Sequence, residues 1–465
     1  MSWRDLCSSL HDFWLEFKRV KYGIAGVILL LVFMAIAILE PFITAFPEVN
    51  ERWRDITYWE DNPKNAAPAW SNIFNPAKKA PQAVLDEPVV ERTTRPGSEQ
   101  QEILFRYRFN YHYPPNDIFL HALGKGTMSL RIRLRRPDGK SLEVYSGVHT
   151  LGSGTPLRIS LGKAGAAQAL EFAKPYEPFI TSLSQEMMRP MEIFFAKAQP
   201  GMLDRPEPLQ GDYEIRVSAL VVGSGSYLKE PRLLITGNVF GLLGTDSSGR
   251  DLWTGVIAGT KWALLIGLLT SAISVIIGIL YGVSSAYFGG WVDALGMRVY
   301  DVFQSIPMLP VLIVLSAIFK PSIWILIAVM CSLFWVGPVR PMRSMALQIK
   351  EETYIEAARA LGASGARIIF RYLIPQMLPY DFALMALSVP GAIVTEATIS
   401  LIGLGDASIV TWGQILHDAM TSGAMLQGIW WWIIPPGLCI ALMGMTFAFV
   451  GYALDTILNP KLRTR

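Results

Sequence analysis

The segment EETYIEAARALGASGARIIFRYLIPQMLP, residues 351–379, places charged, helix-favouring residues between two strongly apolar runs. Apolar residues recur at the spacing of one helix face: Ile355, Ala358 and Leu361. Charged residues occupy another face: Glu352, Glu356 and Arg359. We therefore expect a short amphipathic helix that ends at Gly362, because glycine adopts a left-handed C-cap at little cost. A second helix should follow and be broken at Pro375 before the next apolar run.

The expected helix has features suited to a partner. Glu356 offers an ionic anchor and can pair with Arg359 at i,i+3, while the small Ala357 and Ala358 permit close approach of another surface. The alternative is an amphipathic helix that lies on a membrane surface without any partner. The residues alone leave both readings open.

The flanking sequence is that of an integral membrane protein, with 51% hydrophobic and 17% charged residues. The first apolar run is too long for a signal peptide and lacks a small-residue cleavage site, so we expect an uncleaved spanning helix. A window of about 19 residues predicts six membrane spans. They lie near residues 22–45, 260–286, 297–319, 322–338, 378–400 and 430–452.

The distribution of Lys and Arg predicts the orientation. Basic residues precede the first span, crowd the loop after the fourth and end the chain at Lys461, Arg463 and Arg465, whereas residues 403–428 contain none. The positive-inside rule therefore places both termini and residues 351–379 in the cytoplasm. Trp430–Trp432 then fall at the outer headgroup level, where indole rings are favoured.

This topology places a long insert outside the membrane, and three domains follow: residues 1–46, 47–238 and 239–465, the last with a cytoplasmic loop at about 348–375. The insert begins as a loop rich in Pro and Asn and continues with alternating segments such as EILFRYRFNY and YEIRVSAL. This alternation predicts a small β-sandwich or barrel. Residues 164–198 can add one or two helices.

Several kinds of chemistry find no support in the sequence. The three cysteines and five histidines show no metal-ligand spacing, so we expect no metal site. The basic run RIRLRRPDGK, residues 131–140, alternates like a strand with one solvated face, which argues against a nucleic-acid partner. DGKS at residues 138–141 lacks the first glycine of a phosphate loop, because Leu134 stands there. ATP would therefore bind a separate ATPase.

Glu396 lies near the outer end of the fifth span. An ionisable residue at membrane depth is a candidate functional residue, since desolvation of its charge costs several kcal/mol unless the charge is paired or wetted. Glu396 can line a translocation pathway. Alternatively, it can cap a short external helix or pair with a neighbouring subunit.

The sequence EAA, three residues, Gly and then Pro thirteen positions later resembles the cytoplasmic signature of permease subunits from binding-protein-dependent ABC importers. In that family the segment is the coupling helix, which docks on an ATPase subunit. The resemblance assigns this role to Glu356, Ala357, Ala358, Arg359, Leu361, Gly362 and Pro375. Tyr372 and Ile374 depart from the family pattern, but both substitutions are compatible with an apolar environment.

Further segments resemble the dipeptide/oligopeptide/nickel subfamily, in particular its C-type subunit: GLLGTDSSGRDLW, YFGGWVDALGMRVYDVFQSIPMLP, EATISLIGLG, TWGQIL and GYALDTILNPKLR. They cover about residues 240–465. The resemblance implies an α-helical polytopic protein of the cytoplasmic (inner) membrane with the type I ABC importer permease fold, here carrying a β-rich extracytoplasmic insert. The insert itself departs from the subfamily, whose members have a short loop there.

The resemblance also implies the partners. They are a homologous second permease, two ABC ATPases that bind ATP and Mg, a solute-binding protein, membrane lipid and a peptide-like solute, with nickel complexes and oligosaccharides left open. The chain itself would bind no cofactor and catalyse no reaction. One alternative is a membrane-anchored receptor or scaffold that presents the β-domain, and another is an enzyme in the insert, where no catalytic constellation stands out.

Overall fold

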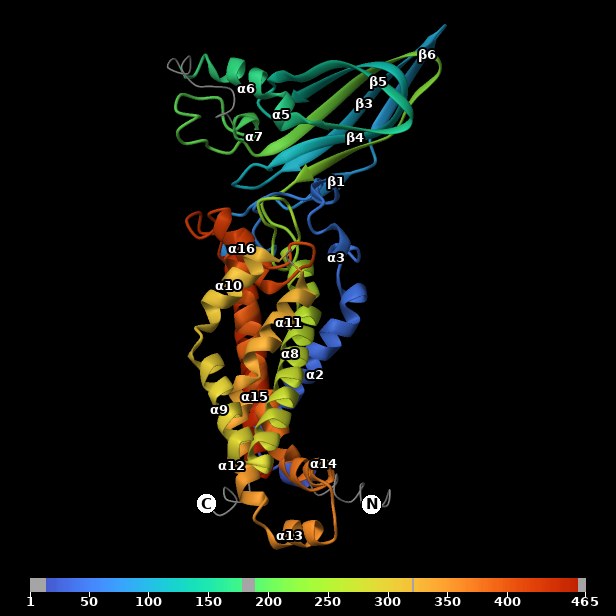
Figure 1. Ribbon diagram of the computed structural model, residues 1–465. Helices are drawn as coiled ribbons and strands as arrows, with labels where there is room; N and C mark the ends of the chain where they lie inside the picture. Colours follow the sequence, from blue (N-terminus) through green and yellow to red (C-terminus); the bar gives the residue numbers. More distant parts are fainter. Residues whose placement is uncertain (1–13, 178–188, 320–321, 459–465) are drawn as a thin grey trace. The chain divides into compact units, whose positions relative to one another are not determined.

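The computed structural model describes residues 14–177, 189–319 and 322–458 (Figure 1). Both termini, which the sequence predicts to be cytoplasmic, lie outside these ranges. The chain forms two compact units, residues 1–54 with 254–465 and residues 55–253. The second unit extends beyond the predicted boundary at 238 because residues 65–69 hydrogen-bond to residues 238–246, for example Asn65 N to Asp246 O at 2.8 Å.

The first unit is helical. Among the described residues, five helical stretches are long and apolar enough to cross a membrane: 21–43, 252–288, 323–349, 365–401 and 430–457. They comprise α2 (Lys21–Ile43), α8 (Leu252–Phe288), α11 (Ile323–Phe334) with α12 (Val336–Ile349), α14 (Gly365–Ile368) with the π-helix η4 (Ile369–Leu373) and α15 (Ile374–Leu401), and α17 (Trp430–Leu458). Helix α13 (Thr353–Ala360) and α16 (Trp412–Thr421) are short connecting helices.

The third predicted span is not one straight helix. Helix α9 (Gly290–Ser305) and α10 (Met308–Ile318) meet at an angle of 78°. Ile306, between them, has extended backbone with ψ 123°, since a residue that precedes proline is disfavoured in the helical region and Pro307 follows. The described chain therefore has six spans only if this bent pair crosses as one.

Small residues allow the long helices to approach closely. A Cβ at Gly26 of α2 would lie 2.8 Å from the Cβ of Phe449 in α17, and one at Gly267 of α8 would lie 2.7 Å from Val389 in α15. Close backbone approach of this kind stabilises helix pairs in membranes, where the lipid supplies little hydrophobic driving force. Gly26 thus allows α2 to approach α17 closely, and Gly267 allows α8 to approach α15 closely.

The second unit is a β-domain with a single antiparallel sheet in the order β2-β3-β6-β4-β5, and β1 pairs with β6. The strands are β1 (Ala83–Leu85), β2 (Val89–Arg95), β3 (Ser98–Phe109), β4 (Asp117–Arg135), β5 (Ser141–Ser160) and β6 (Gly211–Thr236). The expected sandwich or barrel is therefore wrong in detail. The described strands belong to one sheet, and its outermost strands, β2 and β5, do not pair with each other.

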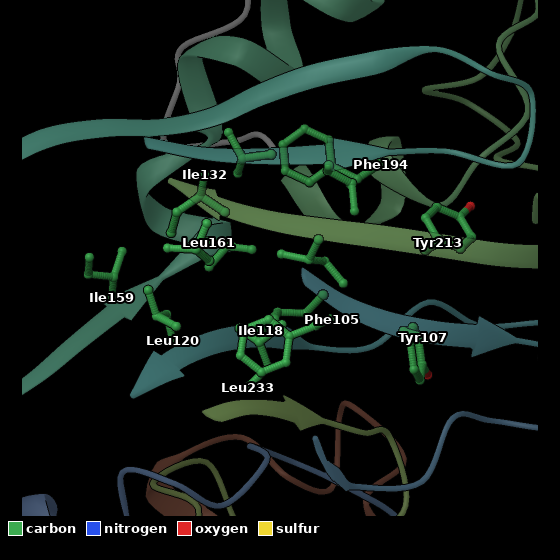
Figure 2. Close-up of a cluster of buried hydrophobic side chains, with 14 of the residues drawn as sticks. Phe105, Tyr107, Ile118, Leu120, Ile132, Ile159, Leu161, Phe194, Tyr213 and Leu233 are labelled. Atoms are coloured by element: carbon green, nitrogen blue, oxygen red, sulfur yellow. The ribbon is translucent and has the colours of Figure 1, made fainter. Parts of the chain in front are cut away.

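One face of the sheet supplies the core of this unit. Buried side chains on it come from both halves of β4, before and after the register shift at Gly124/Gly126, as Ile118, Leu120 and Ile132 show in Figure 2. Phe194 joins the same core from α7 (Pro190–Phe194), as does Leu161 of α5 (Leu161–Ala164). Helix α6 (Ala166–Ala173) adds the buried Ala169 and Ala173. The remaining short helices are η1 (Ile56–Trp59) and α4 (Ser71–Phe74) in this unit and α3 (Val49–Arg52) in the first unit.

The basic run in β4 has the predicted alternation. Ile132 and Leu134 are buried, while the three intervening arginines at 131, 133 and 135 are exposed. Gly139 turns the chain from β4 into β5 with φ +80°. The reading of residues 131–140 as a strand with one solvated face and a hairpin turn is confirmed.

Candidate functional site: the α13 helix and its surroundings

Helix α13 packs against the bundle through buried side chains, and Ile355 is the most deeply buried of them. Ile355 is fully buried, with 0% exposure, in a cluster that includes Val283 of α8, Met342 of α12 and Ile368 of α14. Lys350 Nζ, just before α13, donates to the Ala286 carbonyl of α8 at 3.2 Å. The helix is thus packed against three different helices of the bundle.

The predicted docking residues differ in accessibility. Ala358 is buried, with 7% exposure, so its methyl group packs within this chain and is not free for a partner. The other members of the set are exposed: Glu356, Ala357, Arg359, Leu361, Gly362 and Pro375. Leu361 is the extreme case, at 89% exposure. These exposed residues are the members of the set that another protein can contact.

The end of α13 has the geometry predicted for Gly362. Its φ is +83°, in the left-handed region. Gly362 N donates to Arg359 O at 2.9 Å, and Ala363 N donates to Ala358 O at 3.0 Å. These two bonds are the Schellman motif, which satisfies carbonyls that the last turn leaves without partners. No atom lies within 4 Å of a Cβ built at Gly362, so backbone conformation alone selects glycine there.

The expected i,i+3 pair is not formed. Arg359 does not pair with Glu356; instead its guanidinium lies 5.3 Å from the ring centroid of Tyr287 in α8. A cation over an aromatic face is attracted by the ring quadrupole. Gln376 Nε2 donates to the Tyr354 hydroxyl at 2.5 Å, which adds a polar contact between α13 and α15. Glu356 remains available to solvent.

The helix after Gly362 is not broken at Pro375, contrary to the prediction. Helical structure is continuous from Gly365 to Leu401, with Pro375 in the first turn of α15. The π-helix at Ile369–Leu373 precedes it. In a π-helical turn each amide donates to a carbonyl one position further back than in an α-helix. This shift in the hydrogen-bond pattern lets the helix continue past Pro375, which has no N–H to donate.

Glu396 lies inside the first unit at 4% exposure. Its Oε1 accepts hydrogen bonds from Ser400 Oγ at 2.7 Å and from Thr411 Oγ1 at 2.8 Å. Thr411 is the N-cap of α16, and its Oγ1 accepts from Gln414 N at 3.2 Å. Glu396 therefore fixes the start of α16, and its side chain is closer to the capping alternative than to an open pathway.

Two further polar contacts hold the same region, and sequence reasoning missed both. Arg54 Nη1 donates to both oxygens of Asp418 in α16 at 3.0 Å. Lys261 Nζ of α8 lies 2.8 Å from Glu40 Oε2 of α2. Glu40 and Lys261 each interrupt an apolar run, and a charge inside a predicted span was the signal that could have found them.

Comparison with known proteins agrees with this arrangement. Residues 274–464 match the family model of the binding-protein-dependent transport system inner membrane component, and residues 8–68 match the N-terminal TM domain of oligopeptide transport permease C. α13 lies in the first of these matches. The unmatched residues 69–273 include most of the β-domain.

Individual relatives match about half of the chain. The dipeptide transport system permease protein DppC of Bacillus subtilis is 35% identical over 221 residues, 47% of this chain and 68% of that protein. The oligopeptide transport system permease protein OppC of Haemophilus influenzae is 34% identical over 47% of this chain and 70% of that protein. The oligopeptide transport system permease protein OppC of Bacillus subtilis is 32% identical over 47% of this chain and 72% of that protein.

These matches and the helical first unit confirm the expected polytopic helical membrane protein, and the antiparallel sheet of the second unit confirms a β-rich insert. The matches do not favour a receptor or scaffold. The chain belongs to the family of binding-protein-dependent transport system inner membrane components and is a permease subunit of an importer, not an enzyme.

Proposed function

We propose that this chain is the C-type permease of an ATP-driven importer and forms part of the translocation pathway for peptides or similar solutes. The names of its relatives, which are dipeptide and oligopeptide permeases, support the solute class. The assembly would contain a homologous second permease, two ATPase subunits that hold ATP and Mg, and a solute-binding protein outside.

The observation that carries this proposal is the two-sided environment of α13. Ile355 is buried among side chains of α8, α12 and α14, whereas Leu361, Glu356 and Ala357 are exposed. A partner that binds the exposed side of α13 would move this helix together with the bundle helices against which it packs. ATP-driven motion of the ATPases would thus reach the spanning helices as a rigid-body displacement.

The orientation follows from the same assignment. ATPases are cytoplasmic in this proposal, so α13 faces the cytoplasm and residues 55–253 lie outside, in agreement with the distribution of Lys and Arg. Both termini would be cytoplasmic.

We propose that Glu396 acts on the translocation pathway indirectly, by holding the start of α16, and does not line the pathway with its own side chain. Its hydrogen bond to Thr411 holds the cap of that helix, and Arg54 holds the helix at Asp418. Replacement of Glu396 by Leu would remove the acceptor and free the Thr411 hydroxyl, so the start of α16 would loosen.

Reconstitution tests the proposed function. The chain is purified with the second permease and the ATPases, placed in proteoliposomes and supplied with the solute-binding protein and labelled tri- to hexapeptides. We expect ATP-dependent accumulation of peptide that disappears when the ATPases lack their catalytic base. ATP hydrolysis stimulated by the loaded binding protein, but with no peptide accumulating, would contradict the assigned solute class.

A further inference from the structure

The exposed face of the sheet in residues 55–253 carries a concentration of arginine. We call it the arginine face, defined by Arg106 of β3, Arg131, Arg133 and Arg135 of β4, and Arg216 of β6. Strand register places these residues in three adjacent rows. Arg106 lies opposite Glu214, which lies opposite Arg135, and in the next row Arg216 lies directly opposite Arg133. Side chains directly opposite each other are about 5 Å apart at Cβ.

The pair Arg133 and Arg216 breaks a rule of sheet stability. Like charges directly opposite each other on neighbouring strands are destabilising. Arg133 is partly compensated, since its Nε lies 3.6 Å from Glu143 Oε2, but the same carboxylate also serves Arg131 at 3.3 Å. Within the described chain, Arg216 and Arg106 form no ion pair. A sequence that breaks a local rule without visible compensation commonly does so for function.

The arginine face continues into exposed apolar residues. Leu220 of β6 lies opposite Ser129 of β4, which lies opposite Val148 of β5. Leu220 is 42% exposed and Val148 is 69% exposed, and Val222 in the next row is 46% exposed. Arginine is enriched in protein–protein interfaces and among the residues that contribute most of the binding energy, and these exposed aliphatic side chains add apolar area beside it.

Two other occupants fit this surface less well. A second copy of the chain would bring arginine against arginine. A phosphate polymer or anionic lipid would meet the four carboxylates interspersed in these three rows, Glu91, Glu102, Glu143 and Glu214. A folded protein with its own pattern of acidic and apolar residues satisfies both parts of the surface.

We propose that the arginine face docks an acidic, partly apolar surface of the importer's solute-binding protein. This inference rests on the proposed function, because only an importer supplies that partner on the side where residues 55–253 would lie. Complementary charge would steer the encounter and fix the orientation of the complex.

The test measures binding of the purified solute-binding protein to the assembled transporter in nanodiscs by biolayer interferometry. The variants are Arg216→Ser and Arg133→Ser. Arg92→Ser is the matched control, because Arg92 is an exposed arginine of the same sheet that lies opposite the buried Gln101 and so belongs to the other face. We expect each arginine-face variant to weaken Kd at least about tenfold, and the control to leave Kd unchanged. The wild-type Kd should also weaken as salt rises.

A second readout separates docking from folding. Arg216→Ser removes the like-charge contact, so the unfolding temperature should rise while the affinity falls. Equal affinity for wild type and both arginine-face variants would overturn the proposal while leaving the proposed function intact. Wild type that fails to bind the solute-binding protein at all would instead contradict the proposed function. Salt-sensitive binding of phosphatidylglycerol vesicles that Arg216→Ser abolishes, with no effect on the binding protein, would also overturn it.

Discussion

Truncation of Ile355 should detach α13 from the bundle without unfolding the protein. The side chain is fully buried in the cluster formed with α8, α12 and α14. Ile355→Ala removes three carbon atoms at about 0.8 kcal/mol each and leaves a cavity, a loss of about 3 kcal/mol. At 1.4 kcal/mol per factor of ten, the detached form becomes on the order of 100 times more populated.

Amide hydrogen exchange measures this change directly. We expect exchange at residues 353–362 to accelerate by up to about 100-fold, while α17 and α2 exchange at wild-type rates. Leu361→Ala is the control, because Leu361 is 89% exposed and its truncation should change stability by less than about 0.5 kcal/mol. In the assembled transporter, Ile355→Ala should keep ATP hydrolysis and lose uptake. Unchanged exchange in Ile355→Ala, or equal acceleration in Leu361→Ala, would refute the reasoning.

Three further predictions concern other contacts. Gly362→Val should cost about 1–2 kcal/mol at its left-handed φ and reduce uptake, whereas Gly362→Asn should retain most of it; normal uptake by the Val variant would contradict this. Arg54→Gln should accelerate exchange in α16, since the contact with both oxygens of Asp418 is lost, and unchanged exchange would count against that contact. His121, whose Nε2 lies 3.3 Å from Asp61 Oδ1, and the nearby Arg158 hold the pKa of Asp61 below its usual 3.8. The stabilisation of the fold by ionised Asp61 is therefore present above pH 3.8 and is lost as the pH falls through the folded-state pKa. The unfolding temperature of Asp61→Asn should accordingly lack the decline at acid pH that the wild type shows.

Features that depend on local sequence were predicted well. Apolar runs located the spans, and the glycine requirement at the end of α13 was visible because a left-handed residue follows from the helix stop itself. The alternation of β4 correctly separated its buried from its exposed residues.

Features that depend on contacts between residues far apart in the chain were not predicted. Leu361 was placed on the same face as Ile355, but the helix ends at Ala360 and the C-cap turns Leu361 outward, so helical periodicity no longer applies. Continuation of the helix through Pro375 depends on a π-helical turn that residue spacing does not reveal. The pairing of β4 with both β5 and β6 as one sheet is likewise set by register between strands far apart in the chain.

The electrostatic contacts around α16 belong to the same class. Arg54 and Asp418 are 364 positions apart, and Glu40 and Lys261 are 221 apart. Each of these four residues could be noticed in the sequence as a charge near or within a predicted span, but its ion-pair partner could not be identified from the sequence. The sequence therefore identified Glu396 as a candidate residue, but it could not show which side chains hydrogen-bond to it in the fold.

Cross-linking between α13 and an ATPase subunit tests the central claim most directly. A single cysteine is introduced at Ala357, which is exposed, or at Ala358, which is buried, and the assembled transporter is treated with a short thiol cross-linker; the unaltered chain is the control. We predict that Ala357→Cys joins to the ATPase and that its yield changes when ATP is bound, whereas Ala358→Cys does not react. No cross-link from Ala357→Cys to any ATPase, or efficient labelling from outside the membrane, would contradict the account.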